Sequence, residues 1–131
     1  MLGSCLCGDV RYEITGPLHE FHHCHCSRCR KAHGAPFGTY AGVARADLHF
    51  LRGEESVRAY QSSERVERSF CPRCGSSLFF RTTVFPDSVW IAAGSFDETP
   101  EIRPGFHIFV ASKAPWHEIT DALPQFAEYP E

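Results

Sequence analysis

The seven cysteines constrain this chain most, because every one of them falls into one of three tight clusters. The clusters are Cys5-Leu6-Cys7, Cys24-His25-Cys26-Ser27-Arg28-Cys29 and Cys71-Pro72-Arg73-Cys74. An odd number of cysteines disfavours a framework closed by disulfides. The first residues show no basic stretch followed by an apolar one, so we expect no secretory signal and a reducing, cytoplasmic location. Clustered cysteines in that compartment are typical of metal ligands.

Glycines divide the cysteines into two sites. Gly8 follows Cys7 and Gly75 follows Cys74. A glycine in that position allows the positive φ that curls a tight turn beneath a metal ion. Zinc holds four ligands in a tetrahedron, with zinc–sulfur bonds of about 2.3 Å. The pattern predicts one closed, structural zinc site formed by Cys5, Cys7, Cys71 and Cys74.

The middle cluster has no such glycine and supplies three thiolates on its own. Cys24, Cys26 and Cys29 would fill three positions of a second tetrahedron and leave the fourth one vacant. Structural zinc sites are filled by protein ligands, whereas catalytic sites keep a position for water or substrate. We therefore expect a second zinc ion at this triplet and any chemistry to occur there.

Three other arrangements remain open from the residues alone. One of His22, His23 and His25 would complete the triplet and make it structural as well. The middle cluster would share a site with Cys71 and Cys74 in a second arrangement. In a third, the Cys-Pro-Arg-Cys pair would be a thioredoxin-like redox motif, although that motif belongs to a βαβ unit, for which the chain shows no pattern.

The apolar pattern is mostly typical of strands. Short runs rich in aromatic and β-branched residues are bounded by Gly, Pro, Asp or Ser. They cover residues 10–14, 37–43, 48–51, 66–70, 78–81, 89–93 and 106–110. One short helix is predicted over 27–33, because Gly34 ends it and Pro36 prevents its continuation. The fold class is therefore mainly β, with antiparallel sheets and very short helices, and such a small loop-rich domain often needs a metal to hold it together.

Length and charge narrow the possibilities further. The 131 residues fit a single domain spanning 1–131, and 43% hydrophobic residues suffice for a core. A net charge of −3 argues against nucleic acid as a partner, because phosphates require a basic surface. No window approaches the roughly 20 apolar residues of a membrane span, so we expect no membrane association.

Several motifs resemble one known family. They are Gly3-Ser4-Cys5-Leu6-Cys7-Gly8, the run from Cys24 to Lys31 with Gly34-Ala35-Pro36-Phe37, Phe70-Cys71-Pro72-Arg73-Cys74-Gly75, and C-terminal segments from His107 to Phe126. Together they are similar to the glutathione-dependent formaldehyde-activating enzyme and centromere protein V family. The resemblance implies a fold of coiled antiparallel sheets, like the Mss-four fold of a Rab exchange factor. It also implies two zinc ions, distributed as the glycines indicate.

The reaction implied by the resemblance joins glutathione and formaldehyde to S-(hydroxymethyl)glutathione, a carbon–sulfur lyase activity in reverse. Zinc would deprotonate the thiol, since the thiolate is the nucleophile. We expect Arg28, Arg30 and Lys31 to bind carboxylates of the glutathione-like substrate. The alternative function is a non-enzymatic zinc domain that binds a protein partner or buffers metal.

Other residues carry weaker expectations. His22 and His23 are interpreted as partly buried strand residues rather than a proton shuttle. The segment 106–109 and Trp116 are expected in the core, with one wall of the substrate pocket as the alternative. The tail from Asp121 to Glu131, with two prolines, reads as an extended strap across the surface.

Overall fold

The computed structural model describes residues 1–130 and shows a mainly β fold, which confirms the predicted class. One α-helix, α1, covers Ser27–His33. The strands are β1 (Leu2–Ser4), β2 (Arg11–Ile14), β3 (His19–Cys24), β4 (Gly38–Ala44), β5 (Leu48–Arg52), β6 (Arg58–Gln61), β7 (Val66–Phe70), β8 (Ser77–Thr82), β9 (Ser88–Ala92) and β10 (Phe106–Ile108). Four 3-10 turns cover η1 (Arg45–Asp47), η2 (Glu54–Ser56), η3 (Ala93–Ser95) and η4 (Val110–Ser112).

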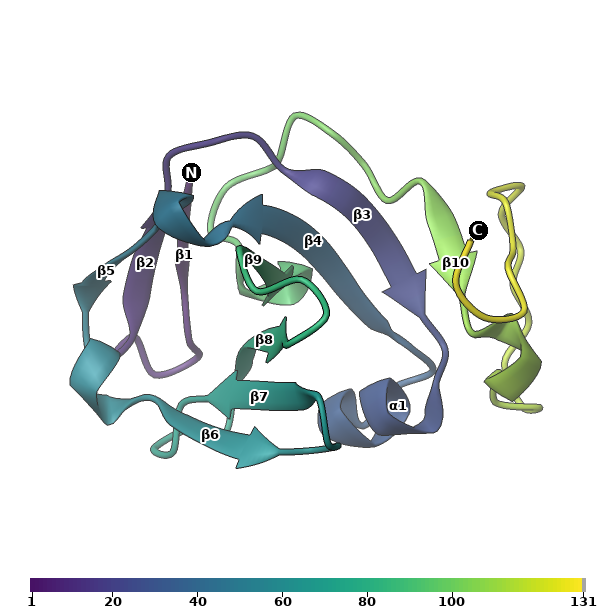
Figure 1. The fold of residues 1–131 in the computed structure, drawn as a ribbon, viewed down its shortest axis with the longest axis horizontal. Helices are drawn as coiled ribbons and strands as arrows, with labels where there is room; N and C mark the ends of the chain where they lie inside the picture. Colours follow the sequence, from purple (N-terminus) through teal and green to yellow (C-terminus); the bar gives the residue numbers. More distant parts are fainter. Residues whose placement is uncertain (131) are drawn as a thin grey trace.

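The strands form two sheets. The smaller one has the order β1-β2-β5, and the larger has the order β10-β3-β4-β9-β8-β7-β6. The larger sheet curls strongly, so that β3 and β4 arch over one side while β6 and β7 lie opposite them (Figure 1). All of these pairs are antiparallel except β10 with β3, which is parallel. The expected antiparallel architecture therefore holds with one exception, where β10 returns after a long connection.

Two apolar clusters hold the fold together. In the first, Val10 and the β2 residues Tyr12 and Ile14 pack together with Val43 of β4 and Ile91 of β9 in the large sheet. Burying an aliphatic side chain of this size contributes about 1.5–3 kcal/mol. The second cluster lies on the other face of the large sheet and includes two cysteines of the triplet. Its buried members are Cys24, Cys29, Tyr40, Phe80, Trp90, Ala92 and Ile108.

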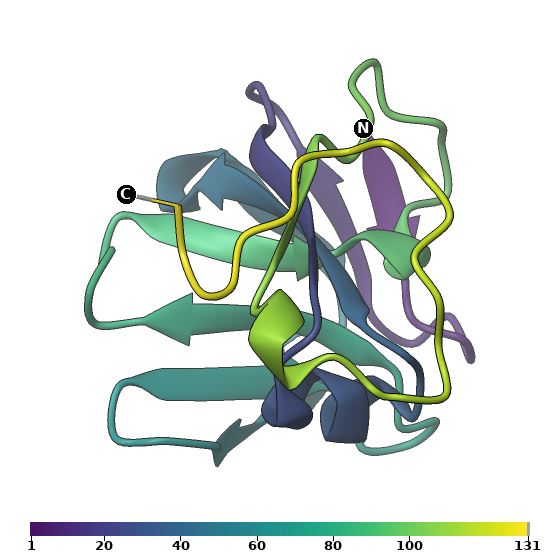
Figure 2. The same cartoon turned by 90° about the vertical axis from the view of Figure 1, so that its right-hand side faces the viewer.

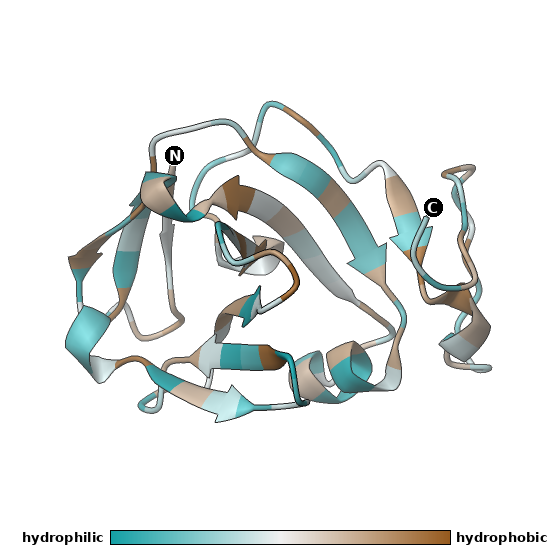
Figure 3. Ribbon diagram, viewed as in Figure 1, coloured by the Kyte–Doolittle hydropathy of each residue, from teal (hydrophilic) through white to brown (hydrophobic). Residues whose placement is uncertain are grey.

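Two strands, β1 and β6, were not predicted, and β3 was anticipated only in the interpretation of His22 and His23 as strand residues. The strand β3 carries His-Glu-Phe-His-His-Cys, and Figure 3 shows it coloured mainly as hydrophilic. His22 is nevertheless buried and His23 half-buried, whereas His19 is exposed. The strand β6 is fully exposed along an edge of the large sheet, and β1 is only three residues long. Neither offers the alternation of buried and exposed residues on which the sequence reading relied.

The helix α1 has the predicted bounds, for identifiable local reasons. It begins after Cys26, whose sulfur accepts a hydrogen bond from the backbone N–H of Cys29. It ends at Gly34, which has φ +58° and donates its N–H to the Arg30 carbonyl. This left-handed cap suits glycine, because it has no Cβ to clash. The helix lies immediately after β3, so it places two further cysteines beside Cys24.

The C-terminal segment runs beside β10 as an extended strap, as expected for the tail up to residue 130; Glu131 lies outside the described residues. The backbone N–H groups of His107, Phe109 and Val110 donate to carbonyls of the segment 124–128, and a parallel bridge joins His107 to Gln125. Figure 2 shows this segment crossing the face formed by β10 and η4. The strap therefore covers the otherwise free edge of the large sheet.

Among the described residues, none of the helices has the length and apolar character needed to cross a bilayer.

Candidate metal centres and adjoining cavities

The first cysteine cluster joins two turns that are far apart in the sequence. The ligand atoms of four cysteines all lie within 4.8 Å of one another: Cys5, Cys7, Cys71 and Cys74. The first two lie in the turn between β1 and β2, and the others in the turn between β7 and β8. Gly8 has φ +79° and Gly75 has φ +78°, so both turns use the backbone conformation expected from the glycines.

The distances in this cluster fit a tetrahedral metal site. Sulfurs bound about 2.3 Å from one zinc ion lie about 3.8 Å apart. The Cys5 and Cys7 sulfurs are 3.6 Å apart, and the Cys7 and Cys71 sulfurs are 3.8 Å apart. A disulfide needs about 2.05 Å, and all seven cysteines are free. The Ser76 hydroxyl donates to the Cys74 sulfur and lowers the pKa of this thiol to about 5, which favours the thiolate that a metal needs.

The second cluster is the predicted triplet at the junction of β3 and α1. The sulfurs of Cys24, Cys26 and Cys29 lie within 4.8 Å of one another. Cys24 and Cys29 are buried and Cys26 is half-buried, so the cluster opens on the Cys26 side. No histidine or carboxylate among residues 1–130 joins either group as a fourth or fifth ligand. The groups also separate the triplet from Cys71 and Cys74, so the structure does not form the shared arrangement.

Hydrogen bonding among the three triplet thiols shifts their pKa values in opposite directions. Hydrogen bonds from the Cys24 and Cys29 thiols hold the pKa of Cys26 far below its ordinary value. The hydrogen bond to Cys26, followed by that to Cys29, raises the pKa of Cys24. Close thiols that stabilise one thiolate in this way form a soft, anionic pocket. Such a donor set fits zinc or another thiophilic metal.

One residue that contacts the triplet, Arg68, was not predicted from the sequence. Arg68 of β7 donates from its NH2 group to the Cys29 sulfur at 3.6 Å and from NH1 to the Tyr40 hydroxyl at 3.1 Å. Its guanidinium carbon lies 5.6 Å from the centre of the Phe80 ring. Residues two apart in a strand share one face, so the apolar Val66 and Phe70 on either side of Arg68 could have indicated that its side chain is partly buried. The triplet therefore has a cation in direct contact.

The histidines beside the triplet are structural partners rather than ligands. His25 is fully buried, and its Nε2 lies 2.8 Å from Nδ1 of His107, whose Nε2 is 3.0 Å from the Asp121 carboxylate. His22 is buried, and its Nδ1–H donates to the Glu20 carbonyl. Burial lowers the pKa of His23 to about 4 and also lowers the pKa of His22. Both are therefore neutral strand residues, as expected.

A cavity of about 740 Å³ adjoins the triplet. Val66 and Phe106 line it and, like Cys26, pack against the buried cluster that contains Cys24 and Cys29, although none of the three cysteines lines the cavity itself. Its remaining walls come from β3, α1, the β6–β7 turn, the end of β8 with the β8–β9 turn, and the C-terminal strap. They include Glu20, His22, Arg28, Arg65, Phe85 and Tyr129. The cavity is thus an apolar groove with charged groups at its edges.

The three predicted substrate-binding residues are placed differently. Arg28 is exposed and lines the cavity beside the triplet. Lys31 is exposed on α1, and the half-buried Arg30 has a buried Nε without a hydrogen-bond partner among the described residues. The expectation of a core position is wrong for Trp116, which is 70% exposed, since the strap leaves its ring in solvent.

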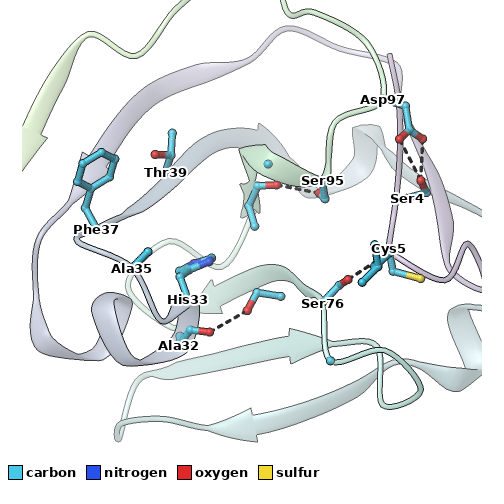
Figure 4. Close-up of a pocket in the computed structure, with 15 residues that line it drawn as sticks. Ser4, Cys5, Ala32, His33, Ala35, Phe37, Thr39, Ser76, Ser95 and Asp97 are labelled. Carbon is cyan, nitrogen blue, oxygen red and sulfur yellow. Dashed lines mark hydrogen bonds between the residues drawn. The ribbon is translucent and has the colours of Figure 1, made fainter.

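A second cavity, of about 770 Å³, lies between the two cysteine sites. Figure 4 shows His33 and Ala35 on one side of it, with Ser76 and Cys5 on the other. Phe37 and Thr39 extend it along β4. Apart from Leu6 and Phe37, its lining consists mainly of small and polar residues. It touches the first cysteine cluster and the end of α1, but not the triplet itself.

Comparisons with known proteins identify a family for this chain. A family model described as "Glutathione-dependent formaldehyde-activating enzyme" matches residues 1–112. The chain belongs to this family. The match contains both cysteine clusters and strand β10, and it stops at the end of η4, before the strap.

Relatives in this family come from bacteria and fungi. A protein of Halomonas elongata, provisionally named a glutathione-dependent formaldehyde-activating enzyme, is 34% identical over 98% of this chain and 88% of its own length. An uncharacterised lyase of Schizosaccharomyces pombe is 25% identical over 95% of this chain and 88% of its own length. A crystal structure of a Rhodobacter sphaeroides protein has a TM-score of 0.65 at 23% identity, covering 79% of this chain and 98% of that one. This last likeness supports the fold alone.

Proposed function

We propose that this chain is a zinc-dependent enzyme of the carbon–sulfur lyase type that acts on a thiol–aldehyde adduct. Its reactants would be glutathione and formaldehyde, as the family description and the name of the Halomonas relative indicate. The observation that carries the proposal is the triplet of Cys24, Cys26 and Cys29, which has three sulfurs, an open side and an adjoining cavity. Catalytic zinc sites have this combination of three protein ligands and one free position.

The two cysteine clusters would have different roles, one structural and one catalytic. Cys5, Cys7, Cys71 and Cys74 supply four sulfurs, which fill a tetrahedron and favour a structural zinc ion. The triplet supplies three, which favours a catalytic ion. When bound there, zinc lowers the pKa of an incoming thiol and so supplies a thiolate at neutral pH. Three thiolate ligands make zinc a weak Lewis acid, so its proposed role is to carry the thiol rather than to polarise the aldehyde.

The reaction forms one bond between the thiol sulfur and the carbonyl carbon. The π bond of the carbonyl breaks, and the proton lost by the thiol ends on the carbonyl oxygen, which gives an S-hydroxymethyl product. The cavity beside the triplet holds the rest of the thiol. Arg28, which lines this cavity, would bind a carboxylate of glutathione, with Arg30 and Lys31 as additional candidates on the same helix. Holding both reactants in one site accelerates the addition by proximity.

The free state of all seven thiols supports a reducing location, and we place the protein in the cytoplasm. Glutathione is the partner that this proposal requires. Neither nucleic acid nor a membrane has a role in it.

The variant Cys26→Ser tests the proposal. The acceleration of hydroxymethylglutathione formation is measured by exchange spectroscopy with labelled formaldehyde, and zinc is counted by elemental analysis. We expect a folded protein with one zinc ion fewer and no acceleration. The matched control is Ser27→Ala, at an exposed neighbouring position. If zinc-loaded wild-type protein does not accelerate the reaction, the alternative of a non-enzymatic zinc domain replaces this proposal.

A further inference from the structure

The guanidinium of Arg68 is held by hydrogen bonds from each of its nitrogens. Nε donates to the Ser62 hydroxyl at 3.1 Å, NH1 to the Tyr40 hydroxyl at 3.1 Å, and NH2 to the Cys29 sulfur at 3.6 Å. The Phe80 ring lies against it, with the guanidinium carbon 5.6 Å from the ring centre. The side chain is therefore fixed in one orientation. That orientation directs one edge of the guanidinium at the triplet.

No carboxylate balances this charge. The ion pairs found among residues 1–130 join Arg52 and Arg73 to Asp9 and His107 to Asp121, and none includes Arg68. A half-buried cation among aromatic rings is costly unless an anion lies nearby. The anionic group that Arg68 contacts is the cysteine triplet, through Cys29. The negative charge of the cysteine triplet therefore balances the positive charge of Arg68.

The triplet in turn needs a cation. Three thiolates on a divalent ion leave one excess negative charge, and a fourth thiolate from a substrate adds another. Excess negative charge weakens the binding of each further anionic ligand, because like charges repel strongly in a poorly solvated site. The single positive charge of Arg68 offsets one of them at hydrogen-bonding distance. Hydrogen bonds to ligating sulfurs also tune thiolate–metal sites.

We propose that Arg68 is a positioning residue that acts as the counter-cation of the Cys24–Cys26–Cys29 centre. It holds the Cys29 thiolate as a ligand and allows a further thiolate to join the metal. This inference rests on the proposed thiol-binding function, and it adds a determinant outside the cysteine clusters.

Two further residues brace the arginine. The Tyr40 oxygen accepts from Arg68, and its O–H is then free to donate to Nε2 of His33, 2.6 Å away. Burial lowers the pKa of His33, so its ring stays neutral and Nε2 remains an acceptor. His33 lies one turn after Cys29 on α1. The chain of contacts thus joins β7, β4 and α1 around the triplet and fixes the distance between cation and sulfur.

The test uses full-length protein loaded with Co²⁺, whose absorption reports thiolate coordination without any turnover. A chelator removes cobalt from the two sites in turn, and the four-cysteine site serves as an internal reference. We expect Arg68→Met to weaken cobalt binding at the triplet about 10–100-fold, the usual effect of removing a partner of a metal ligand. Arg68→Lys should restore most of the affinity, because it keeps the charge and loses only the planar geometry. The control Arg45→Met removes an exposed arginine in η1 and should leave both sites unchanged.

Glutathione titration provides a second measurement. The cobalt spectrum of the triplet should change at a higher glutathione concentration in Arg68→Met than in wild type, and at an intermediate one in Arg68→Lys. If Arg68→Met does not fold, judged by circular dichroism and by the four-cysteine reference, then Arg68→Lys and Tyr40→Phe carry the test. Tyr40→Phe removes the brace and should weaken the triplet a few-fold.

Wild-type affinity for both cobalt and glutathione in Arg68→Met overturns the inference, as does wild-type affinity in both Arg68→Lys and Tyr40→Phe. The outcome is separable from that of the proposed function. Wild-type protein that gives no acceleration with formaldehyde refutes the lyase activity, while a weakened triplet in Arg68→Met still supports the counter-cation.

Discussion

Substituting Cys74 by serine should remove the main cross-link of the fold. The four-cysteine cluster ties the β1–β2 turn to the β7–β8 turn, and the linked sulfurs of Cys7 and Cys71 belong to residues 64 positions apart. A metal bound by both turns closes this loop in the folded state. Cys74→Ser leaves three sulfurs, so the ion is held weakly and the loop is open in the absence of metal.

The size of the effect follows from the loop length. By analogy with a disulfide, closing a loop of roughly 65 residues contributes about 4 kcal/mol. Zinc free energies in small structural sites, about 10–16 kcal/mol, make this a lower bound. For 131 residues, an unfolding entropy of about 2.1 cal/mol/K per residue converts 4 kcal/mol into a drop of about 15 °C in Tm. Many domains have only 5–15 kcal/mol in total, so unfolding at room temperature is also expected to become detectable.

The assay combines thermal melting, followed by circular dichroism, with elemental analysis of the purified protein. Cys26→Ser is the matched control: it also removes one sulfur, but from a cluster confined to six residues, and should lower Tm by much less. Chelator should destabilise wild type strongly and Cys74→Ser little further. If the Tm of Cys74→Ser lies within about 2–3 °C of the wild-type Tm, far less than the expected drop of about 15 °C, the four-cysteine cluster does not stabilise the fold.

Three further predictions concern residues around the triplet. Arg28→Ala should raise KM for glutathione about 10–100-fold with little change in kcat, since one charge-assisted hydrogen bond contributes about 1.5–3 kcal/mol; an equal effect of Lys31→Ala would contradict this role. Asp121→Ala leaves the buried Nε2–H of His107 without its acceptor and should cost about 1–3 kcal/mol in urea unfolding. Because burial lowers the pKa of His33, the imidazole is protonated at a lower pH in the folded protein than in the unfolded chain. Stability from this group is complete above about pH 6.5 and falls as the pH drops below it, so His33→Gln should reduce the difference between urea midpoints at pH 7 and 5.5.

The sequence predicted the parts of the fold that depend on local chemistry. The helix Ser27–His33 was correct because Gly34 and Pro36 end it whatever surrounds it. The two glycine-flanked turns have the expected positive φ for the same reason. Seven expected strand segments correspond to strands in the structure, although β10 is shorter than the segment 106–110. In these strands the apolar residues mark burial, on one face in β2 and on both faces in β4, β8 and β9.

Residues whose surroundings come from distant segments were not predictable in this way. The strand β3 is composed mainly of polar residues, and His22 is buried because it lies between β4 and β10 rather than through an apolar character of its own. The chain from His25 through His107 to Asp121 joins residues up to 96 positions apart, with no spacing that a sequence pattern would reveal. Trp116 was expected inside on the strength of its apolar ring and lies outside.

The two cysteine clusters differ in how far they depend on local sequence and on distant segments. The triplet is local, so its ligands follow from six consecutive residues, and its counter-charge is supplied by β7, 39 residues further along the chain. The four-cysteine cluster joins distant turns, so it forms only when the sheets have assembled around it. That assembly also fixes the position of β7, because Cys71 directly follows the last residue of this strand, Phe70. Arg68 lies on the same strand, three residues before Cys71. A metal in the first cluster would therefore fix the strand that carries the cation of the second, which couples the stability of one site to the charge of the other.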